Sequence, residues 1–236
     1  MTMPSPNLRR AVSIGVGAVR LEGLLDVPAG AHGIVLFAHG SGSSRLSPRN
    51  TYVADRLRDS GFATVLFDLL TAGEERIDAA TGHLRFDIPL LTKRLLAVTG
   101  WAQAERQLLH LPVGYFGAST GAAAALTAAA RMPSVGAVVS RGGRPDLTGL
   151  VLAEVHSPTL LIVGGNDLEV LELNRQALGR LRCEAQLEVV PGATHLFEEP
   201  GALETVADLA AEWFVRHLDS KSRSNALART TYRKAT

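Results

Sequence analysis

A short stretch near the middle of the chain changes from strand-like to helix-like sequence within five residues. Residues 112–116 are mostly apolar, whereas residues 122–131 consist almost wholly of alanine and other strong helix formers. The change must therefore occur within residues 117–121, Gly-Ala-Ser-Thr-Gly. Glycine on both sides permits a strained turn and a close approach of the helix to the strand. The pattern predicts a strand, a sharp turn with Ser119 exposed at its apex, and a helix.

Elsewhere, short apolar runs alternate with amphipathic segments along most of the chain. Two β-prone runs joined through Gly17 predict an antiparallel hairpin, and several later runs are continuously apolar, as are strands buried on both faces of a parallel sheet. The expected strands are 12–16, 19–27, 33–38, 63–67, 112–116, 135–140, 159–163 and 185–190, and the expected helices are 50–60, 88–98, 122–131, 168–181 and 203–218. This alternation predicts an α/β fold whose sheet is mostly parallel after the hairpin, with helices on both faces.

Residues 69–99 form the longest departure from this rhythm. A polar segment at 71–82 precedes the helix expected at 88–98, which could continue to residue 108. An excursion at this place is expected to be a loop or a small lid over the strand ends. We expect residues 1–219 to form one domain that includes this excursion. Residues 220–236 hold five basic and no acidic residues with little apolar content, which predicts a disordered basic tail.

Composition excludes several classes of protein. With 46% hydrophobic and 20% charged residues, the chain can bury one sizeable core. A net charge of +1 argues against a nucleic-acid partner, and no window reaches the roughly 18 apolar residues of a membrane span. The one cysteine, Cys183, excludes an intramolecular disulfide and fits a reducing compartment. We therefore expect a cytoplasmic protein that binds neither nucleic acid nor membrane.

Four loops that follow expected strands carry residues suited to catalysis. They hold His39-Gly40-Ser41, Ser119, Asp167 and His195. In an open α/β sheet, ligands bind outside the carboxyl ends of the strands, so these loops should meet. A serine hydroxyl becomes a nucleophile when a histidine takes its proton and a carboxylate orients that histidine. The chain order serine, aspartate, histidine is the one expected after a Gly-x-Ser-x-Gly turn, and it predicts a catalytic triad.

Other polar residues near these loops have alternative interpretations. His39 could be a base, but its place beside Gly40 favours a structural role in shaping its loop. Asp68 also follows a strand and is an alternative triad acid, although it precedes the serine in the chain. Arg141 and Arg85 could bind an anionic group of a substrate, or could be satisfied by loop carbonyls or a surface acid.

The motifs together resemble the dienelactone-hydrolase-like group of the α/β-hydrolases. The resemblance covers residues 12–218 and rests on the sequences HGSG at 39–42, GASTG at 117–121, GGND at 164–167 and GATHLF at 192–197. It implies an eight-stranded fold, the triad and a hydrolytic reaction. Dienelactone hydrolases proper use a cysteine nucleophile, whereas this chain has Ser119, which favours an ordinary carboxylic ester as substrate. Similar domains occur fused to phosphoribosyltransferases, but this chain is too short to hold one and shows no phosphate loop of that type.

The expected reaction is cleavage of a small ester or lactone through a covalent acyl-enzyme, with no metal or cofactor. Ser119 attacks the carbonyl, His195 moves the proton and Asp167 orients the imidazole. The sharp turn at residues 117–121, here called the elbow, is typical of sites in which two backbone N–H groups form an oxyanion hole. It predicts that the N–H groups of Thr120 and Ser41 have this role. Two alternatives stay open: a non-catalytic binding or regulatory module of the same fold, and an acyltransferase or perhydrolase with the same triad.

Overall fold

The protein is described here from a computed structural model, which describes residues 7–218. The expected tail at 220–236 lies outside these residues. The strands are β1 (Leu8–Val16), β2 (Val19–Val27), β3 (Gly33–Ala38), β4 (Phe62–Phe67), β5 (Val113–Ala118), β6 (Ala137–Arg141), β7 (Thr159–Gly164) and β8 (Ala185–Val190). They form one eight-stranded sheet in the order β1-β2-β4-β3-β5-β6-β7-β8. The pairs β1–β2 and β2–β4 are antiparallel and all others are parallel, which confirms the predicted hairpin and the mostly parallel sheet after it.

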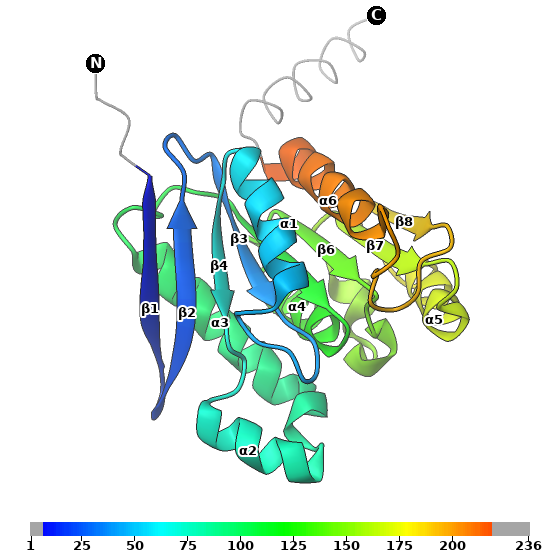
Figure 1. Cartoon of the computed structure of the whole chain (residues 1–236), viewed down its shortest axis with the longest axis horizontal. Helices are drawn as coiled ribbons and strands as arrows, with labels where there is room; N and C mark the ends of the chain where they lie inside the picture. The colour runs from blue at the N-terminus through cyan, green and yellow to red at the C-terminus, as the bar shows by residue number, and fades with distance from the viewer. Residues whose placement is uncertain (1–6, 219–236) are drawn as a thin grey trace, which may run out of the picture.

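Helices cover both faces of the sheet (Figure 1). They are α1 (Pro48–Asp59), α2 (Ala72–Thr81), α3 (Ile88–Ala104), α4 (Thr120–Arg131), α5 (Leu168–Leu178) and α6 (Ala202–Leu218), with short 3₁₀ turns at Leu84–Phe86, Pro145–Thr148 and Val151–Glu154. Helices α1 and α6 pack together over one face, and α3 and α4 over the other. Two apolar clusters result, one on each side of the sheet.

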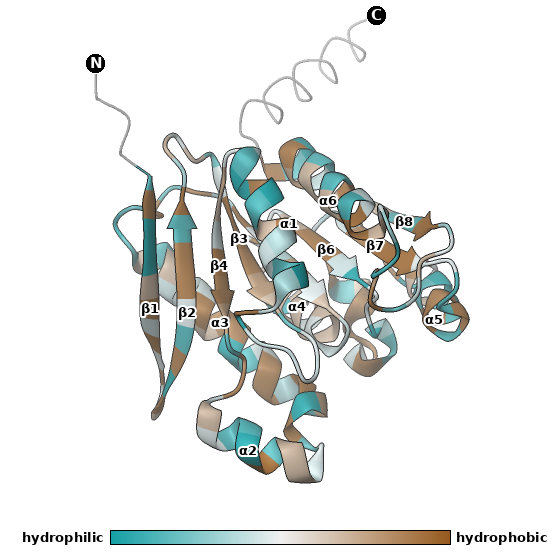
Figure 2. Ribbon diagram, viewed as in Figure 1, coloured by the Kyte–Doolittle hydropathy of each residue, from teal (hydrophilic) through white to brown (hydrophobic). Residues whose placement is uncertain are grey.

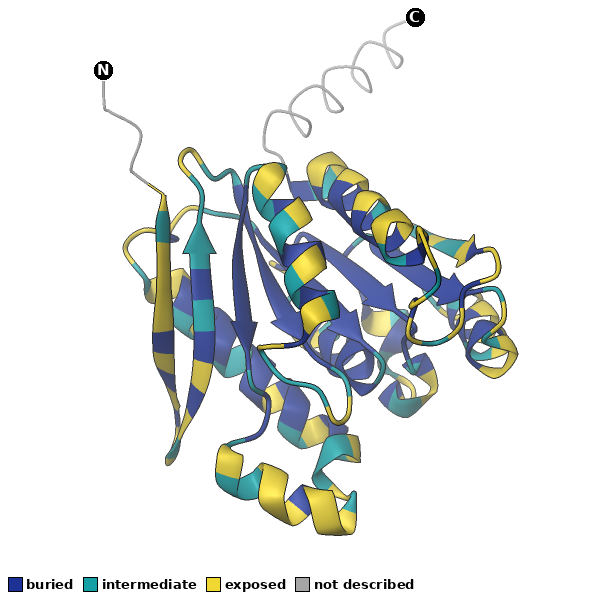
Figure 3. Ribbon diagram, viewed as in Figure 1, coloured by how far each residue is buried: buried dark blue, intermediate teal, exposed yellow. Residues whose placement is uncertain are grey.

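The burial of each strand follows its place in the sheet. Every residue of β3 to β7 is buried, which explains why these strands are mostly apolar (Figures 2 and 3). The edge strands β1 and β8 have exposed residues along their length instead. The parallel strands all end at one edge of the sheet, so the loops that follow β3, β5, β7 and β8 are brought to the same place.

The polar segment at 71–82 contains a helix that the sequence interpretation had not placed. The Thr71 side chain accepts a hydrogen bond from the Glu74 N–H, and the Glu74 carboxylate accepts one from the Thr71 N–H, which is a capping box. Gly82 ends the helix in the left-handed conformation. Helix α2 lies past the edge at which β3 and β4 end, and most of its surface is exposed (Figures 1 and 3).

Several other boundaries differ by a few residues from those expected. Helix α1 begins two residues early because Ser47 caps it and Pro48 occupies its first turn. Strand β6 runs from Ala137 to Arg141, so Arg141 belongs to the strand and does not follow it. Helix α3 ends at Ala104, short of residue 108.

Candidate active site

Ser119 occupies a strained turn between β5 and α4. Its φ of 51° and ψ of −121° lie outside the regions that serine normally adopts. A side chain could not replace either flanking glycine: a Cβ on Gly117 would lie 2.5 Å from Ala122 Cα, and one on Gly121 would lie 2.2 Å from Ala38 O. Backbone contact between β5, α4 and the end of β3 therefore determines where the serine sits. Strain of this kind, worth about 1–3 kcal/mol, is typical of functional sites.

A histidine and an aspartate from two other loops form a close hydrogen-bonded pair. His195 Nδ1 lies 2.6 Å from Asp167 Oδ2. Asn166 N–H donates to Ala193 O at 2.9 Å, and a Cβ on Gly164 would lie 2.4 Å from the same oxygen. The loops after β7 and β8 are thus packed backbone to backbone. The carboxylate accepts from one ring nitrogen, which leaves the other nitrogen of His195 available to take a proton.

The end of β6 brings this pair next to the serine. Ser119 N–H donates to Arg141 O at 3.2 Å, and the imidazole lies against the following residue, where a Cβ on Gly142 would be 3.4 Å from His195 Cε1. Within residues 7–218, Ser119 Oγ has no hydrogen-bond partner. Catalytic hydrogen bonds often tighten only when substrate is bound. The geometry thus brings nucleophile, base and acid candidates to one edge of the sheet.

Two backbone amides near Ser119 lack an acceptor among the described residues. The loop after β3 passes so close to the elbow that a Cβ on Gly40 would lie 3.0 Å from Ser119 Cβ. The hydroxyl groups of Ser41 and Thr120 lie 3.2 Å apart and hold the loop to the first turn of α4. Among the described residues, neither the Ser41 N–H nor the Thr120 N–H has an acceptor. The Thr120 amide also lies at the positive end of the α4 dipole.

His39 has both ring nitrogens occupied by the backbone. Its Nδ1 donates to Gly40 O at 2.9 Å, and its Nε2 accepts from Leu69 N–H at 2.9 Å. Burial lowers the pKa of His39, so the ring is neutral in this role. The residue joins the loop after β3 to the start of the excursion, which fits the structural interpretation. The other competing residue, Asp68, pairs with Arg45 and not with a histidine.

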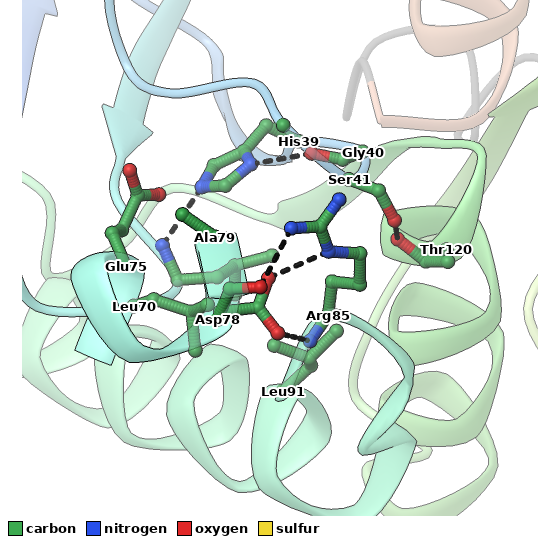
Figure 4. Close-up of a pocket in the computed structure, with 12 residues that line it drawn as sticks. His39, Gly40, Ser41, Leu70, Glu75, Asp78, Ala79, Arg85, Leu91 and Thr120 are labelled. Atoms are coloured by element: carbon green, nitrogen blue, oxygen red, sulfur yellow. Dashed lines mark hydrogen bonds and ion pairs between the residues drawn. The ribbon is translucent and has the colours of Figure 1, made fainter. Parts of the chain in front are cut away.

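A cavity of about 110 Å³ lies beside the two free amides (Figure 4). It is lined by His39, Gly40, Ser41, Gly42, Leu69, Leu70, Glu75, Asp78, Ala79, Arg85, Leu91 and Thr120. Arg85 extends into it from the excursion, held by Asp78 through a 2.6 Å contact between Nε and Oδ2 and a 2.9 Å hydrogen bond from Nη2 to Asp78 O. The guanidinium is therefore fixed in position before any substrate arrives.

Arg141 lies elsewhere and does not line this cavity. Its side chain is buried, and its Nε and Nη1 have no hydrogen-bond partner among the described residues. The guanidinium carbon lies 6.0 Å from the centre of the Phe197 ring, two residues beyond His195. Burial, and secondarily the charge of Arg49, lowers the pKa of Arg141 to about 10.

Sequence reasoning missed the charged residues that hold the excursion in place. Arg94, on α3, donates to Leu69 O at 2.9 Å and to the Glu74 carboxylate at 2.7 and 2.5 Å. Asp78 accepts from the Leu84 and Arg85 N–H groups at 2.7 and 3.0 Å. The capping box of Thr71 and Glu74 was a local signal for α2, whereas the partner of Arg94 lies twenty residues away and left no local pattern.

Residues 7–218 contain neither a metal-binding cluster nor a membrane-spanning helix. No cluster of three or more histidine, cysteine or acidic side chains in this range could hold a metal ion. None of the helices in this range is long and apolar enough to cross a membrane.

Comparisons with known proteins agree with this fold. A dienelactone hydrolase from Anabaena variabilis is 58% identical, with a TM-score of 0.88 over 91% of this chain and 100% of that one. The protein Est1E from Butyrivibrio proteoclasticus shares the fold, with a TM-score of 0.74 over 87% of this chain and 98% of that one, at 16% identity.

Two proteins of Mycobacterium tuberculosis, provisionally named phosphoribosyl transferases, are 59% identical over 215 residues. The alignment covers 90% of this chain and 48% of each relative, so the chain spans about half the length of these relatives. The family model described as "Dienelactone hydrolase family" matches residues 21–230. The chain belongs to the dienelactone hydrolase family.

Proposed function

We propose that the protein is a serine hydrolase that cleaves small carboxylic esters or lactones. The observation that carries this proposal is the 2.6 Å contact of His195 with Asp167, at the sheet edge where Ser119 is held at a φ of 51°. A buried turn does not need a serine at a positive φ, nor a neighbouring histidine oriented by a carboxylate. Nucleophilic catalysis needs both, because the serine must be exposed and its proton must have an acceptor.

In the proposed reaction, Ser119 Oγ forms a bond to the ester carbonyl carbon while its proton passes to His195 Nε2. The tetrahedral intermediate collapses, the bond to the leaving oxygen breaks, and His195 returns the proton to that oxygen. Water then attacks the acyl-enzyme with His195 again as base, which releases the carboxylic acid and restores the serine. Asp167 stabilises the imidazolium at each stage and is not itself protonated.

The negative charge that develops on the carbonyl oxygen would be bound by the Ser41 and Thr120 N–H groups. Both amides lack an acceptor among the described residues, so no existing bond must break when the charge appears. Each preorganised donor of this type contributes about 3–4 kcal/mol of transition-state stabilisation. Water excluded by the cavity wall would strengthen these bonds further.

Of the two arginines considered for substrate binding, Arg85 has the more favourable position. It lines the cavity next to Ser41 and Thr120, and its Nη1 has no partner among the described residues. We propose that this group binds a polar or anionic atom of the substrate. Arg141 remains a weaker proposal for the same role, because it is buried against Phe197 and away from the cavity.

The test compares wild-type protein with Ser119→Ala on p-nitrophenyl acetate and butyrate. We expect kcat to fall by about 10⁴-fold or more in the variant, while a fluorophosphonate probe labels only the wild type. Asp68→Asn is a matched control at a carboxylate of the same sheet edge that does not contact His195. Equal rates for wild type and Ser119→Ala, or fluorophosphonate labelling of the variant, would show that Ser119 is not the nucleophile.

A further inference from the structure

The cavity beside Ser41 and Thr120 shares a wall with a second cavity. The first, here called the inner cavity, has a volume of about 110 Å³ and includes Ser41 and Thr120. The second, here called the outer cavity, has a volume of about 330 Å³ and is lined by Arg20, Glu22, Ser44, Arg45, Asp68, Leu70, Thr71, Ala72 and Glu75. Leu70 and Glu75 are the two residues that line both. What these two side chains do decides whether the cavities act separately or as one.

The inner cavity is placed to receive the acyl part of an ester. In the proposed reaction His195 gives its proton to the leaving oxygen, so the leaving group must lie on the His195 side of the carbonyl. The inner cavity is lined by the oxyanion residues Ser41 and Thr120 and by the excursion, with no residue from the loops that carry Asp167 and His195. The acyl chain therefore extends away from His195 into this space.

Leu70 closes the inner cavity at the end away from the oxyanion residues. In the close-up, Ser41 and Thr120 lie on one side of Arg85, and Leu70 and Glu75 lie on the other (Figure 4). Leu70 is only 5% exposed and packs in the core cluster, whereas Glu75 lies on the exposed surface of α2. Leu70 is thus the fixed part of the wall. The volume of the inner cavity, about 110 Å³, is well below the roughly 300–1,000 Å³ of pockets that hold drug-sized ligands.

The outer cavity would suit a polar chain better than an alkyl chain. Five of its nine lining residues are charged: Arg20, Glu22, Arg45, Asp68 and Glu75. Arg45 pairs with Asp68, and the Arg20 guanidinium binds Ser13. A hydrocarbon entering this space would strip water from charged groups without replacing their hydrogen bonds, whereas ether or hydroxyl oxygens would supply acceptors.

We propose that Leu70 is the specificity-determining residue of this site: it restricts the enzyme to short acyl groups and separates the inner cavity from a polar extension behind it. This inference rests on the proposed function, because it assumes that the acyl group of an ester occupies the inner cavity. It assigns Leu70 no part in the chemical steps. Removal of its side chain should therefore change which esters react while leaving the nucleophile, base and oxyanion donors in place.

The experiment measures kcat/KM for three p-nitrophenyl esters: acetate, heptanoate and (2-methoxyethoxy)acetate. The last two have acyl chains of equal length but different polarity. In Leu70→Ala we expect the ratio of the methoxyethoxyacetate to the acetate rate to rise by about tenfold or more over wild type, with a smaller rise for heptanoate. Leu91→Ala is the matched control, because Leu91 lines the inner cavity but not the outer one, and we expect its ratios to change less than threefold.

A second variant tests the same idea without removing a buried side chain. Ala79 is exposed on α2 and lines the inner cavity, so Ala79→Leu should fill part of that space with a good helix former. We expect the butyrate to acetate ratio to fall by about tenfold. Thermal unfolding of each variant shows that the protein compared is folded, and the use of ratios within one protein cancels losses of active enzyme.

Each outcome decides the proposal. A rise in the ratio of the methoxyethoxyacetate to the acetate rate in Leu70→Ala, without a similar rise in Leu91→Ala, supports the proposal that Leu70 separates the two cavities. Equal profiles for these two variants, or an unchanged butyrate to acetate ratio in Ala79→Leu, overturn it while ester hydrolysis by wild type still stands. Ester hydrolysis by Ser119→Ala at the wild-type rate overturns the proposed function, and this inference with it.

Discussion

The loop after β3 and the excursion at 69–99 line one cavity, but different interactions build the strand-end loops and the excursion. At the strand ends, backbone meets backbone: a Cβ on Gly121 would lie 2.2 Å from Ala38 O, and one on Gly164 would lie 2.4 Å from Ala193 O. In the excursion, charged side chains reach across sequence: Arg85 holds Asp78, and Arg94 holds Glu74. The first region permits almost no substitution, whereas the second depends on pairs of residues that could change together.

This difference separates two kinds of consequence. Changes at the strand ends should remove reactivity, because they displace the groups that would touch the reacting atoms. Changes in the excursion should alter stability and selectivity, because this region supplies much of the cavity wall, including the polar side chains of Glu75, Asp78 and Arg85.

The largest effect is expected from Asp167→Asn. The amide keeps the shape of the side chain but favours the wrong tautomer of His195, and we expect kcat for p-nitrophenyl acetate to fall by about 10⁴-fold. Asp68→Asn, which disturbs the pair with Arg45, should reduce kcat by less than tenfold. Urea unfolding of both variants separates loss of chemistry from loss of folding. A larger loss of kcat in Asp68→Asn than in Asp167→Asn would show that Asp167 is not the acid of the triad.

The next largest effect distinguishes two glycines, one from each region. Gly121→Ala should destabilise the fold by about 3 kcal/mol or more, because the added carbon meets backbone atoms that cannot move separately. Gly82 ends α2 at a φ of 66°, and a Cβ added there would meet nothing within 4 Å. We therefore expect Gly82→Ala to lower the free energy of unfolding by only about 1 kcal/mol. Both are measured by urea unfolding. Similar losses for the two variants would mean that conformational strain, and not close packing, determines the elbow.

The same contrast explains what the sequence could predict. The mostly parallel sheet after the hairpin and the meeting of the four loops followed from apolar runs and chain order, because parallel strands share one edge, whereas the strand order came only from the structure. The role of the elbow glycines could be predicted because a close approach of two backbone segments requires glycine. These features are imposed by local chemistry, so a single sequence contains them.

The excursion was harder to interpret because its contacts are not local. Arg94 carries no motif, and its position in an apolar helix suggests nothing about Glu74 twenty residues earlier. The sequence suggested Arg85 as a substrate-binding residue. In the structure its guanidinium forms an ion pair with Asp78, the one buried residue of α2. Helix α2 itself has a weak apolar face, and only the capping box marked its start.

A third prediction tests whether Arg94 anchors the excursion. Arg94→Met leaves Glu74 and the Leu69 carbonyl without their donor, and we expect a loss of about 2 kcal/mol, below the usual range for buried pairs because the Glu74 side chain is 25% exposed. Hydrogen exchange should quicken at residues 71–86 more than in β5. Arg10→Met, which removes the more exposed pair with Glu105, should change stability by less than about 1 kcal/mol. Uniformly faster exchange in Arg94→Met would show that the pair supports the whole sheet and not the excursion alone.

The smallest expected effect is an acid dependence carried by the excursion. Burial alone would raise the pKa of Asp78, but hydrogen bonds from the Arg85 backbone and guanidinium and from Leu84 N–H outweigh it and hold that pKa below its ordinary value. Burial would likewise raise the pKa of Glu74, while Arg94 and Thr71 lower it overall. A carboxylate whose pKa is lowered by folding stabilises the protein above the ordinary value of about 4, and that stability is lost as the pH falls through the lowered pKa.

We therefore expect wild type to be more stable than Asp78→Asn at pH 7, and the difference to shrink as the pH falls below about 4. Urea unfolding of both proteins between pH 7 and pH 3 measures the difference. As the pH is lowered, protection from hydrogen exchange should be lost at residues 71–86 before it is lost in β5. The reason is that the strand ends are held by backbone contacts that do not titrate. A stability difference that stays constant over this range would mean that Asp78 acts through its shape and hydrogen bonds alone. The contrast between a charge-held excursion and a backbone-held edge would then reduce to packing.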